Sequence, residues 1–184
     1  MIVLNVILAV VYASSIERLL HKYVMHRPVG RFRYPFEAHT LTHHRIFKAD
    51  LTYHLVHDED KSTIPMAWWN APVLVACATL PAALLSFATG IWTFSIVTAA
   101  VVYAYYGAYE YFHWCMHLPK SRRIERSWLF RRLNGHHLLH HRYMNKNFNV
   151  VLPLADFLFG SLMLRSPVCF AQTIGPSVPD VQPR

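Results

Sequence analysis

Positive charge is missing from two long stretches of this 184-residue chain. The 18 Lys and Arg residues give a net charge of +8, yet none precedes Arg18 and none lies between Lys61 and Lys120. Glu110 is the only acidic residue in the second gap. A gap of this length is too apolar for a solvated surface or a nucleic-acid groove, so no nucleic-acid partner is expected. The basic residues instead flank apolar segments, as they do beside membrane spans.

Cysteine is scarce as well. The chain has three cysteines, Cys77, Cys115 and Cys169, and no two of them form a CxxC pair. An odd number at wide spacing argues against both a disulfide framework and a thiolate metal site. Cys115 lies between two histidines, but it is expected to be an ordinary buried thiol.

Apolar residues are abundant and concentrated in three runs. They make up 54% of the chain, above the fraction usual in soluble domains. Residues 2–20, 66–89 and 91–112 are each about long enough, at roughly 1.5 Å per residue, to cross a bilayer core of roughly 30 Å. Thr89-Gly90 is expected to turn the last two runs into a hairpin. The first run lacks a basic start and a cleavage site, which indicates a retained span rather than a signal peptide.

These features predict an all-α fold, specifically an integral membrane helical bundle with a histidine-rich helical cap on its cytosolic side. A single domain is expected over residues 1–165, followed by a poorly ordered tail over 166–184. One span and one hairpin leave the remaining residues on one side of the membrane. Because these residues carry the Lys and Arg, that side is predicted to be cytoplasmic, in a bacterial inner membrane or the endoplasmic reticulum.

Histidine is the residue type present in excess. The 13 histidines fall into groups near the predicted membrane boundaries. The groups are His21 and His26; His39, His43 and His44; His54 and His57; His113 and His117; and His136, His137, His140 and His141. Imidazole is a common ligand of transition metals, so this grouping predicts a metal site. Ten of these rings, all except those of His54, His57 and His136, are the candidate ligands. Ten rings exceed the coordination of one ion, and two metals are therefore expected.

The spacing within the groups suggests helices. His113 and His117 are separated by about 40° around a helix, so both rings can reach one ion. A spacing of four recurs between His39 and His43, beside His44, and spacings of three and four recur among His137, His140 and His141, so these groups are also expected to share one face. His21 and His26 lie about 140° apart on a straight α-helix, which is unfavourable for one ion. This pair is expected either to bracket two metals or to need local unwinding near Pro28.

Three histidines are not expected to bind metal. His54 and His57 are predicted to be ordinary surface residues. His136 and His137 compete for one position, and the tighter spacing favours His137 as the ligand, with His136 beside the site.

Two acidic residues each precede a candidate histidine ligand by about one helical turn. Glu17 is four residues before His21, and Glu110 is three before His113. Each is expected to orient a ligating ring by accepting its second N–H. The alternative is direct metal ligation, as in the Glu-x-x-His motif of soluble di-iron proteins.

The order of the histidine groups resembles a known family. His21-x4-His26, His39-x3-His43-His44, His113-x3-His117 and His137-x2-His140-His141 together resemble the fatty acid hydroxylase and sterol desaturase superfamily of membrane di-iron enzymes. The resemblance runs from about His21 to Gly160, and Asn147 and Asp156 match the family's terminal signature. The segment HKYVMH also resembles beta-carotene hydroxylases.

The resemblance implies two iron ions held by the ten histidines, with zinc as a possible substitute in purified protein. It implies O2 as co-substrate and hydroxylation of a fatty acyl, sterol or carotenoid-like lipid. Electrons are expected from a separate protein, a ferredoxin or a b-type cytochrome with its reductase. Asn147 and Asp156 are expected beside the metal site. Lipid desaturation is the alternative reaction, and a non-enzymatic histidine-rich metal-binding membrane protein is the alternative class.

A basic amphipathic segment follows Pro119. Ile124, Trp128, Leu129 and Leu133 alternate there with arginines. The pattern suits a helix lying on anionic lipid headgroups and equally a docking face for an acidic electron donor. The sequence leaves both open.

Overall fold

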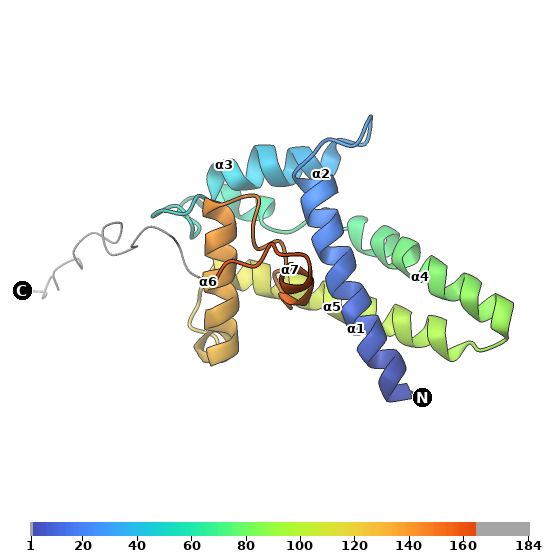
Figure 1. Ribbon diagram of the computed structural model, residues 1–184. Coiled ribbons are helices and arrows are strands. Elements are labelled where there is room, and N and C mark those ends of the chain that lie inside the picture. The colour runs from blue at the N-terminus through green and yellow to red at the C-terminus, as the bar shows by residue number, and fades with distance from the viewer. Residues whose placement is uncertain (1, 165–184) are drawn as a thin grey trace, which may run out of the picture.

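The computed structural model describes residues 2–164, and in this range the chain is helical (Figure 1). The predicted all-α class is therefore confirmed for these residues, while the predicted tail over 166–184 lies outside them. The long helices are α1 (Ile2–Leu20), α4 (Asn70–Thr89), α5 (Thr93–His117) and α6 (Trp128–Arg142). The short ones are η1 (His21–Met25), α2 (Tyr34–Phe36), η2 (Glu37–His43), α3 (His44–Ile46), η3 (Asp58–Thr63), η4 (Ile124–Arg126) and α7 (Leu154–Leu158).

The first predicted span coincides with α1. The helix does not stop at Leu20, because η1 continues it as a π-helical turn to Met25. Arg27-Pro28 follows, and the residue before a proline is disfavoured in helical conformation, so the helix ends there. The extension places His21 on the helix itself and His26 at its end.

The predicted hairpin is formed by α4 and α5. Gly90 lies between them with φ of 72°, in the left-handed region where glycine carries no Cβ penalty. The helix bounds differ from the predicted runs: α4 begins at Asn70 rather than at residue 66, and α5 continues past residue 112 to His117. This continuation holds two of the predicted ligands on a regular helix.

Two helical segments, Ile2–Met25 and Asn70–Thr89, are long and apolar enough to cross a membrane. Only 11% of the apolar window of α4 is buried, far less than in the core helix of a soluble protein, which is mostly buried. Helix α5, the third predicted span, has 25 residues but does not meet the same test within the described residues. Its tyrosines and Glu110 make it less apolar than the other two.

Small side chains bring the long helices together. Ala13 of α1, Ala78 of α4 and Val102 of α5 form a buried cluster where the helices meet. The Tyr12 hydroxyl donates to the Ala78 carbonyl over 2.9 Å and links α1 to α4. The start of α1 and the α4–α5 turn lie toward the same end of the molecule (Figure 1).

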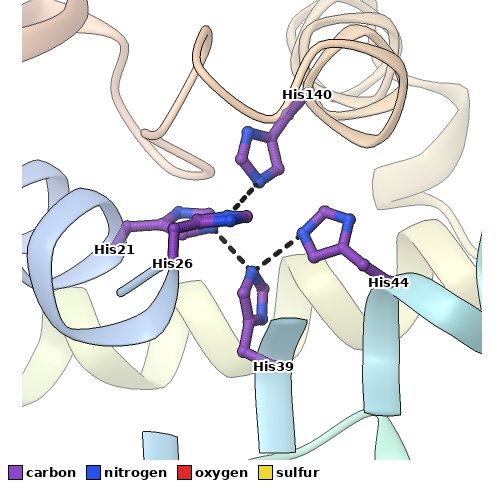
Figure 2. Close-up of side chains that lie close together, drawn as sticks. All are labelled: His21, His26, His39, His44 and His140. Carbon is purple, nitrogen blue, oxygen red and sulfur yellow. Dashed lines mark hydrogen bonds between the residues drawn. The ribbon is translucent and has the colours of Figure 1, made fainter. Parts of the chain in front are cut away.

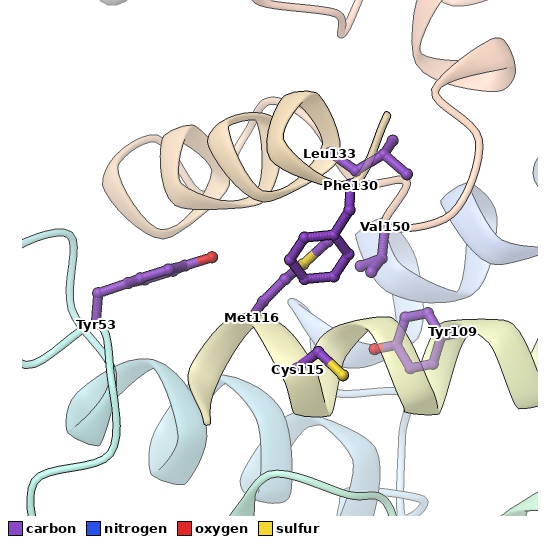
Figure 3. Close-up of a cluster of buried hydrophobic side chains, with 7 residues drawn as sticks. All are labelled: Tyr53, Tyr109, Cys115, Met116, Phe130, Leu133 and Val150. Atoms are coloured by element: carbon purple, nitrogen blue, oxygen red, sulfur yellow. The ribbon is translucent and has the colours of Figure 1, made fainter. Parts of the chain in front are cut away.

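A second apolar cluster attaches α6 to the end of α5 (Figure 3). Its buried members are Tyr53, Tyr109, Cys115, Met116, Phe130, Leu133 and Val150. Ser127 caps α6, since its hydroxyl accepts from the Phe130 amide over 3.1 Å. The amphipathic pattern predicted here holds in part. Phe130 and Leu133 are buried, whereas Trp128 and Leu129 are exposed beside exposed arginines.

Gly90 and Gly107 offer a test of the hairpin turn, because an added Cβ meets nothing within 4 Å at either position. We expect Gly90→Ala to lower the free energy of unfolding by about 1–2 kcal/mol, since its φ is positive. Gly107→Ala, inside α5, is expected to be neutral or stabilising by up to about 1 kcal/mol. Denaturant unfolding of the solubilised protein measures both. Equal effects of the two substitutions would contradict the strained turn.

Candidate metal centre

Ten histidine rings converge in the structure, and they are the ten named as candidate ligands from the sequence. They form two groups of five, and in each group the ligand atoms lie within 4.8 Å of one another. Site 1 comprises His21, His26, His39, His44 and His140. Site 2 comprises His43, His113, His117, His137 and His141. Nine of the ten rings are buried and His26 is half-buried, so this is an interior arrangement rather than a surface cluster.

The pair His21 and His26 belongs to one site, although a straight α-helix would separate the two rings. The His26 amide bonds to the His21 carbonyl, five residues back, over 3.1 Å. In this π-helical turn, residues five apart fall on the same side, and the two rings stack with centroids 5.1 Å apart. The expected alternatives, bracketing two metals or unwinding at Pro28, are thus replaced by a wider helical turn.

A π-helical turn also occurs in the second histidine group. The His44 amide bonds to the His39 carbonyl at the end of η2, again five residues back. The Nε2 atoms of His39 and His44 come within 3.0 Å of each other. The two pairs of candidate ligands spaced by five residues, His21 with His26 and His39 with His44, therefore both serve site 1 through π turns, which are frequent at functional sites.

The spacing predicted that His39, His43 and His44 share one face, and likewise His137, His140 and His141. This prediction is corrected, because adjacent histidines serve different sites. His43 lies in site 2 and its neighbour His44 in site 1. Likewise His140 lies in site 1 and His141 in site 2. Consecutive residues point about 100° apart on a helix, so η2–α3 and α6 can each supply both sites. The two sites are neighbours, because the His44 and His141 ring centroids are 4.3 Å apart.

The nitrogen spacing within each site suits metal coordination. In site 1 the Nε2 atoms of His21 and His39 are 2.8 Å apart, and those of His26 and His140 are 3.0 Å apart (Figure 2). In site 2 the distances are 3.2 Å for His43–His113, 3.2 Å for His117–His137 and 3.0 Å for His137–His141. Two nitrogens bound at right angles, each about 2.1 Å from an ion, lie about 3 Å apart.

Backbone carbonyls hold the far side of several rings. The Nδ1 atoms of His117, His140 and His141 lie 2.7, 2.7 and 2.6 Å from the carbonyl oxygens of Tyr53, Lys146 and Phe47. His21 Nδ1 bonds in the same way to the Phe148 carbonyl. A carbonyl only accepts, so each Nδ1 carries the proton and each Nε2 presents a lone pair. This is the arrangement usual for metal-bound histidine.

A hydroxyl group holds His26 in the same tautomer, with the proton on Nδ1. Thr40 Oγ1 donates its proton to the Met25 carbonyl over 2.7 Å, so it must accept from His26 Nδ1, 3.2 Å away. The Nε2 atom of His26 is then bare. It faces the bare Nε2 of His140 at 3.0 Å with no proton available between them.

Site 2 has a similar shortage of protons. His137 Nε2 lies between the Nε2 atoms of His117 and His141, both of which are bare because their Nδ1 atoms donate to carbonyls. His137 can supply one proton at most to these two contacts. At least one contact in each site therefore sets two lone pairs against each other. A cation bound among the nitrogens turns that repulsion into coordination, so the residues fit metal ions.

Burial keeps the rings neutral. Removal from water lowers the pKa of His26 to about 3 and that of His140 to about 4. Burial first, and then neighbouring imidazoles, also lower the pKa of His39, His44 and His137 well below 6.5. A neutral ring is the form that binds metal. Neither site includes a carboxylate among the described residues, so bound divalent ions would keep their full charge.

His136 lies outside both sites, in agreement with the choice of His137. Its Nε2 is 3.3 Å from Asp156 Oδ2. Asp156 is completely buried and also accepts from the Asn149 amide and the Ser161 hydroxyl, both over 2.7 Å. Arg18 of α1 bonds to Ser161 over 2.8 Å. This network ties the segment after α6 to α1.

Asn147 contributes to the same region. Its side chain donates to the His136 carbonyl over 3.1 Å and accepts from the Met163 amide over 2.6 Å. Its φ of 56° is left-handed, a conformation that asparagine tolerates. Asn147 thus shapes the loop that presents the Lys146 and Phe148 carbonyls to His140 and His21.

Glu17 and Glu110 have other partners than the predicted rings. Glu17 accepts from the Tyr105 hydroxyl, the Asn149 side chain and the Val150 amide, each over 2.7 Å. Glu110 accepts from the Tyr106 hydroxyl. Within the described residues, the rings with an assigned Nδ1 partner are oriented by backbone carbonyls or Thr40, not by these acids. Sequence reasoning missed the carbonyls because any side chain can stand at such a position.

His54 and His57 are exposed and belong to neither site, as expected for surface residues. His54 Nδ1 bonds to the Met116 carbonyl over 3.1 Å.

An apolar pocket of about 360 Å³ adjoins site 1. Helices α1, α4 and α5 supply most of its wall, and His21 is the one site 1 ligand in that wall. No site 2 ligand lines it. Tyr109 lines the pocket and stacks on His113 with centroids 5.6 Å apart, which places Tyr109 between the pocket and site 2.

Comparison of the chain with protein-family models, with curated proteins and with solved structures gives no match.

The division into two sites predicts which pairs of histidine substitutions lower the metal content further than either substitution alone. We expect wild-type protein to bind about two divalent ions per chain, and His140→Ala or His141→Ala alone to bind about one tightly. His39→Ala combined with His140→Ala damages only site 1 and should still bind about one. His140→Ala combined with His141→Ala damages both sites and should bind almost none. Anaerobic iron(II) loading followed by elemental analysis measures this.

The control for these variants is His54→Ala, which removes an exposed ring outside both sites. If the two double variants retained equal amounts of metal, the division into sites would be wrong.

Proposed function

We propose that the protein is a membrane di-iron oxygenase that uses O2 to hydroxylate the apolar chain of a lipid. The observation that carries the proposal is the pair of adjacent five-histidine sites, one of which reaches into an apolar pocket between long helices. Hydroxylation consumes one O2, two electrons and two protons, and it yields the alcohol and one water.

The donor set supports iron over a structural zinc. Structural zinc sites are closed by four ligands in a tetrahedron. Each site here offers five nitrogens, several of them about 3 Å apart, which suits a six-coordinate ion with one position left for another ligand. Iron bound there supplies oxidising chemistry that no side chain provides.

The chain's own residues have three tasks in this proposal. The ten imidazoles hold the metals, and the carbonyls behind them keep the protons on Nδ1. The pocket wall excludes water and aligns an apolar chain beside His21. Tyr109 separates that chain from site 2.

The exposed apolar surface supports a membrane location. Large apolar side chains of α1 and α4 are exposed, among them Leu4, Ile7, Leu84 and Phe87. Exposure on this scale would be a liability in water, whereas lipid covers it without cost. In the proposed topology the metal sites face the cytoplasm, because the basic residues lie on that side of the spans.

Electrons are proposed to come from a separate protein. Exposed Arg123, Arg126, Arg131 and Arg132 form a basic face along η4 and α6 that would attract an acidic donor. Trp128 and Leu129 are exposed beside them and would suit the bilayer surface, so the face can lie at the boundary between lipid and cytosol.

Lipid profiling tests the proposal directly. The wild-type chain, His117→Ala and His140→Ala are expressed in one lipid-rich host, and extracted lipids are compared by mass spectrometry. We expect a lipid that has gained one oxygen atom with wild type and none with either variant, since each removes a ligand from one site. All three proteins should insert into the membrane, because the apolar helices do not depend on the metal.

His54→Ala is the control and should retain the product. A product that has lost two hydrogens instead would indicate desaturation. Oxygen-independent product formation, or full activity of His117→Ala and His140→Ala, would contradict the proposal.

A further inference from the structure

The apolar pocket ends at the same level on all three helices that form it. Its wall reaches down to Tyr12 and Ala13 on α1, to Ala78 on α4 and to Val102 on α5. Ala9, one turn further along α1, is buried but does not line the pocket. The cavity is therefore closed at this end.

The closure is made by packing and by one hydrogen bond. Ala13, Ala78 and Val102 pack together as a buried cluster, and the Tyr12 hydroxyl crosses from α1 to the Ala78 carbonyl over 2.9 Å. We propose that these four residues, the pocket floor, act as a length gauge that limits how far an apolar chain extends beyond site 1. Describing that chain as the substrate rests on the proposed function.

The distance from the floor to the metal site sets the scale of the gauge. Tyr12 and His21 are nine residues apart on one helix, which corresponds to about 13 Å along its axis. His21 is the site 1 ligand in the pocket wall. The helix length between Tyr12 and His21 would thus set the distance between site 1 and the end of a chain that touches the pocket floor.

The polar groups in the wall do not compete for the chain. Glu17 lines the pocket, but both of its carboxylate oxygens already accept hydrogen bonds, from Tyr105, Asn149 and the Val150 amide. Tyr105 and Tyr106 likewise direct their hydroxyls to Glu17 and Glu110. With these groups satisfied, the wall suits an uncharged straight chain.

Binding strength should therefore depend on chain length up to the floor and not beyond it. Each methylene transferred from water to an apolar pocket improves affinity by about fourfold. Once the chain reaches the floor, a further methylene gains nothing, and the affinity series shows a break.

The experiment measures this break without metal or oxygen. Tritiated dodecanol is bound to the full-length protein in digitonin, which has no straight alkyl tail, and is displaced by unlabelled n-alkanols from hexanol to octadecanol. Ala13→Leu raises the floor, so the break should move to shorter chains, and the longest alkanol that wild type accepts should lose about tenfold in affinity. Tyr12→Ala lowers the floor, so the break should move to longer chains.

Ala9→Leu is the matched control, because it adds the same side chain to a buried position of α1 outside the pocket. Its break should stay where wild type has it. Poor folding cannot imitate the expected result, since Ala13→Leu and Tyr12→Ala shift the break in opposite directions. An unmoved break in both, an equal shift in Ala9→Leu, or no alkanol binding by wild type would overturn the gauge.

Iron content and oxygen-dependent product are measured on the same preparations. A moving break in a protein that binds no iron would refute the proposed oxygenase and leave the gauge standing. An unmoved break in an active two-iron enzyme would refute the gauge alone.

Discussion

In each of two adjacent histidine groups, at least one pair of imidazole nitrogens sets lone pair against lone pair at about 3 Å, and the rest of the structure is arranged around this contact. Such a contact is repulsive unless a cation shares the electron pairs. The carbonyls of Phe47, Tyr53 and Lys146 enforce it, because they keep the proton on the opposite side of each ring. Burial then prevents protonation from relieving it, as the low pKa of His26 and His140 indicates. The interior is thus prepared for metal ions.

Holding so many rings together requires rigid support from segments far apart in the chain. The apolar cluster around Met116 attaches α6 to α5, and Asp156 ties the segment after α6 to α1 through Ser161 and Arg18. The second link also positions the Phe148 carbonyl behind His21. A buried polar network of this kind is costly unless every member is satisfied, and here it orders the loop next to the metal sites.

The two sites differ in what surrounds them. Site 1 contributes His21 to the apolar pocket, whereas site 2 lies behind Tyr109. Helix α1, which carries Tyr12 at the pocket floor, continues directly into η1, which presents His21, so the pocket floor and site 1 lie on one continuous helical segment.

The sequence by itself identified the ten candidate histidines, the apolar helices and the turn at Gly90, because composition and short spacing are local properties. Only the tertiary structure decided that His43 and His44, or His140 and His141, belong to different sites. It also decided the π turns at His21 and His39, the carbonyl partners and the closed end of the pocket. These depend on which backbone groups pack against which rings, and a backbone carbonyl leaves no trace in side-chain identity.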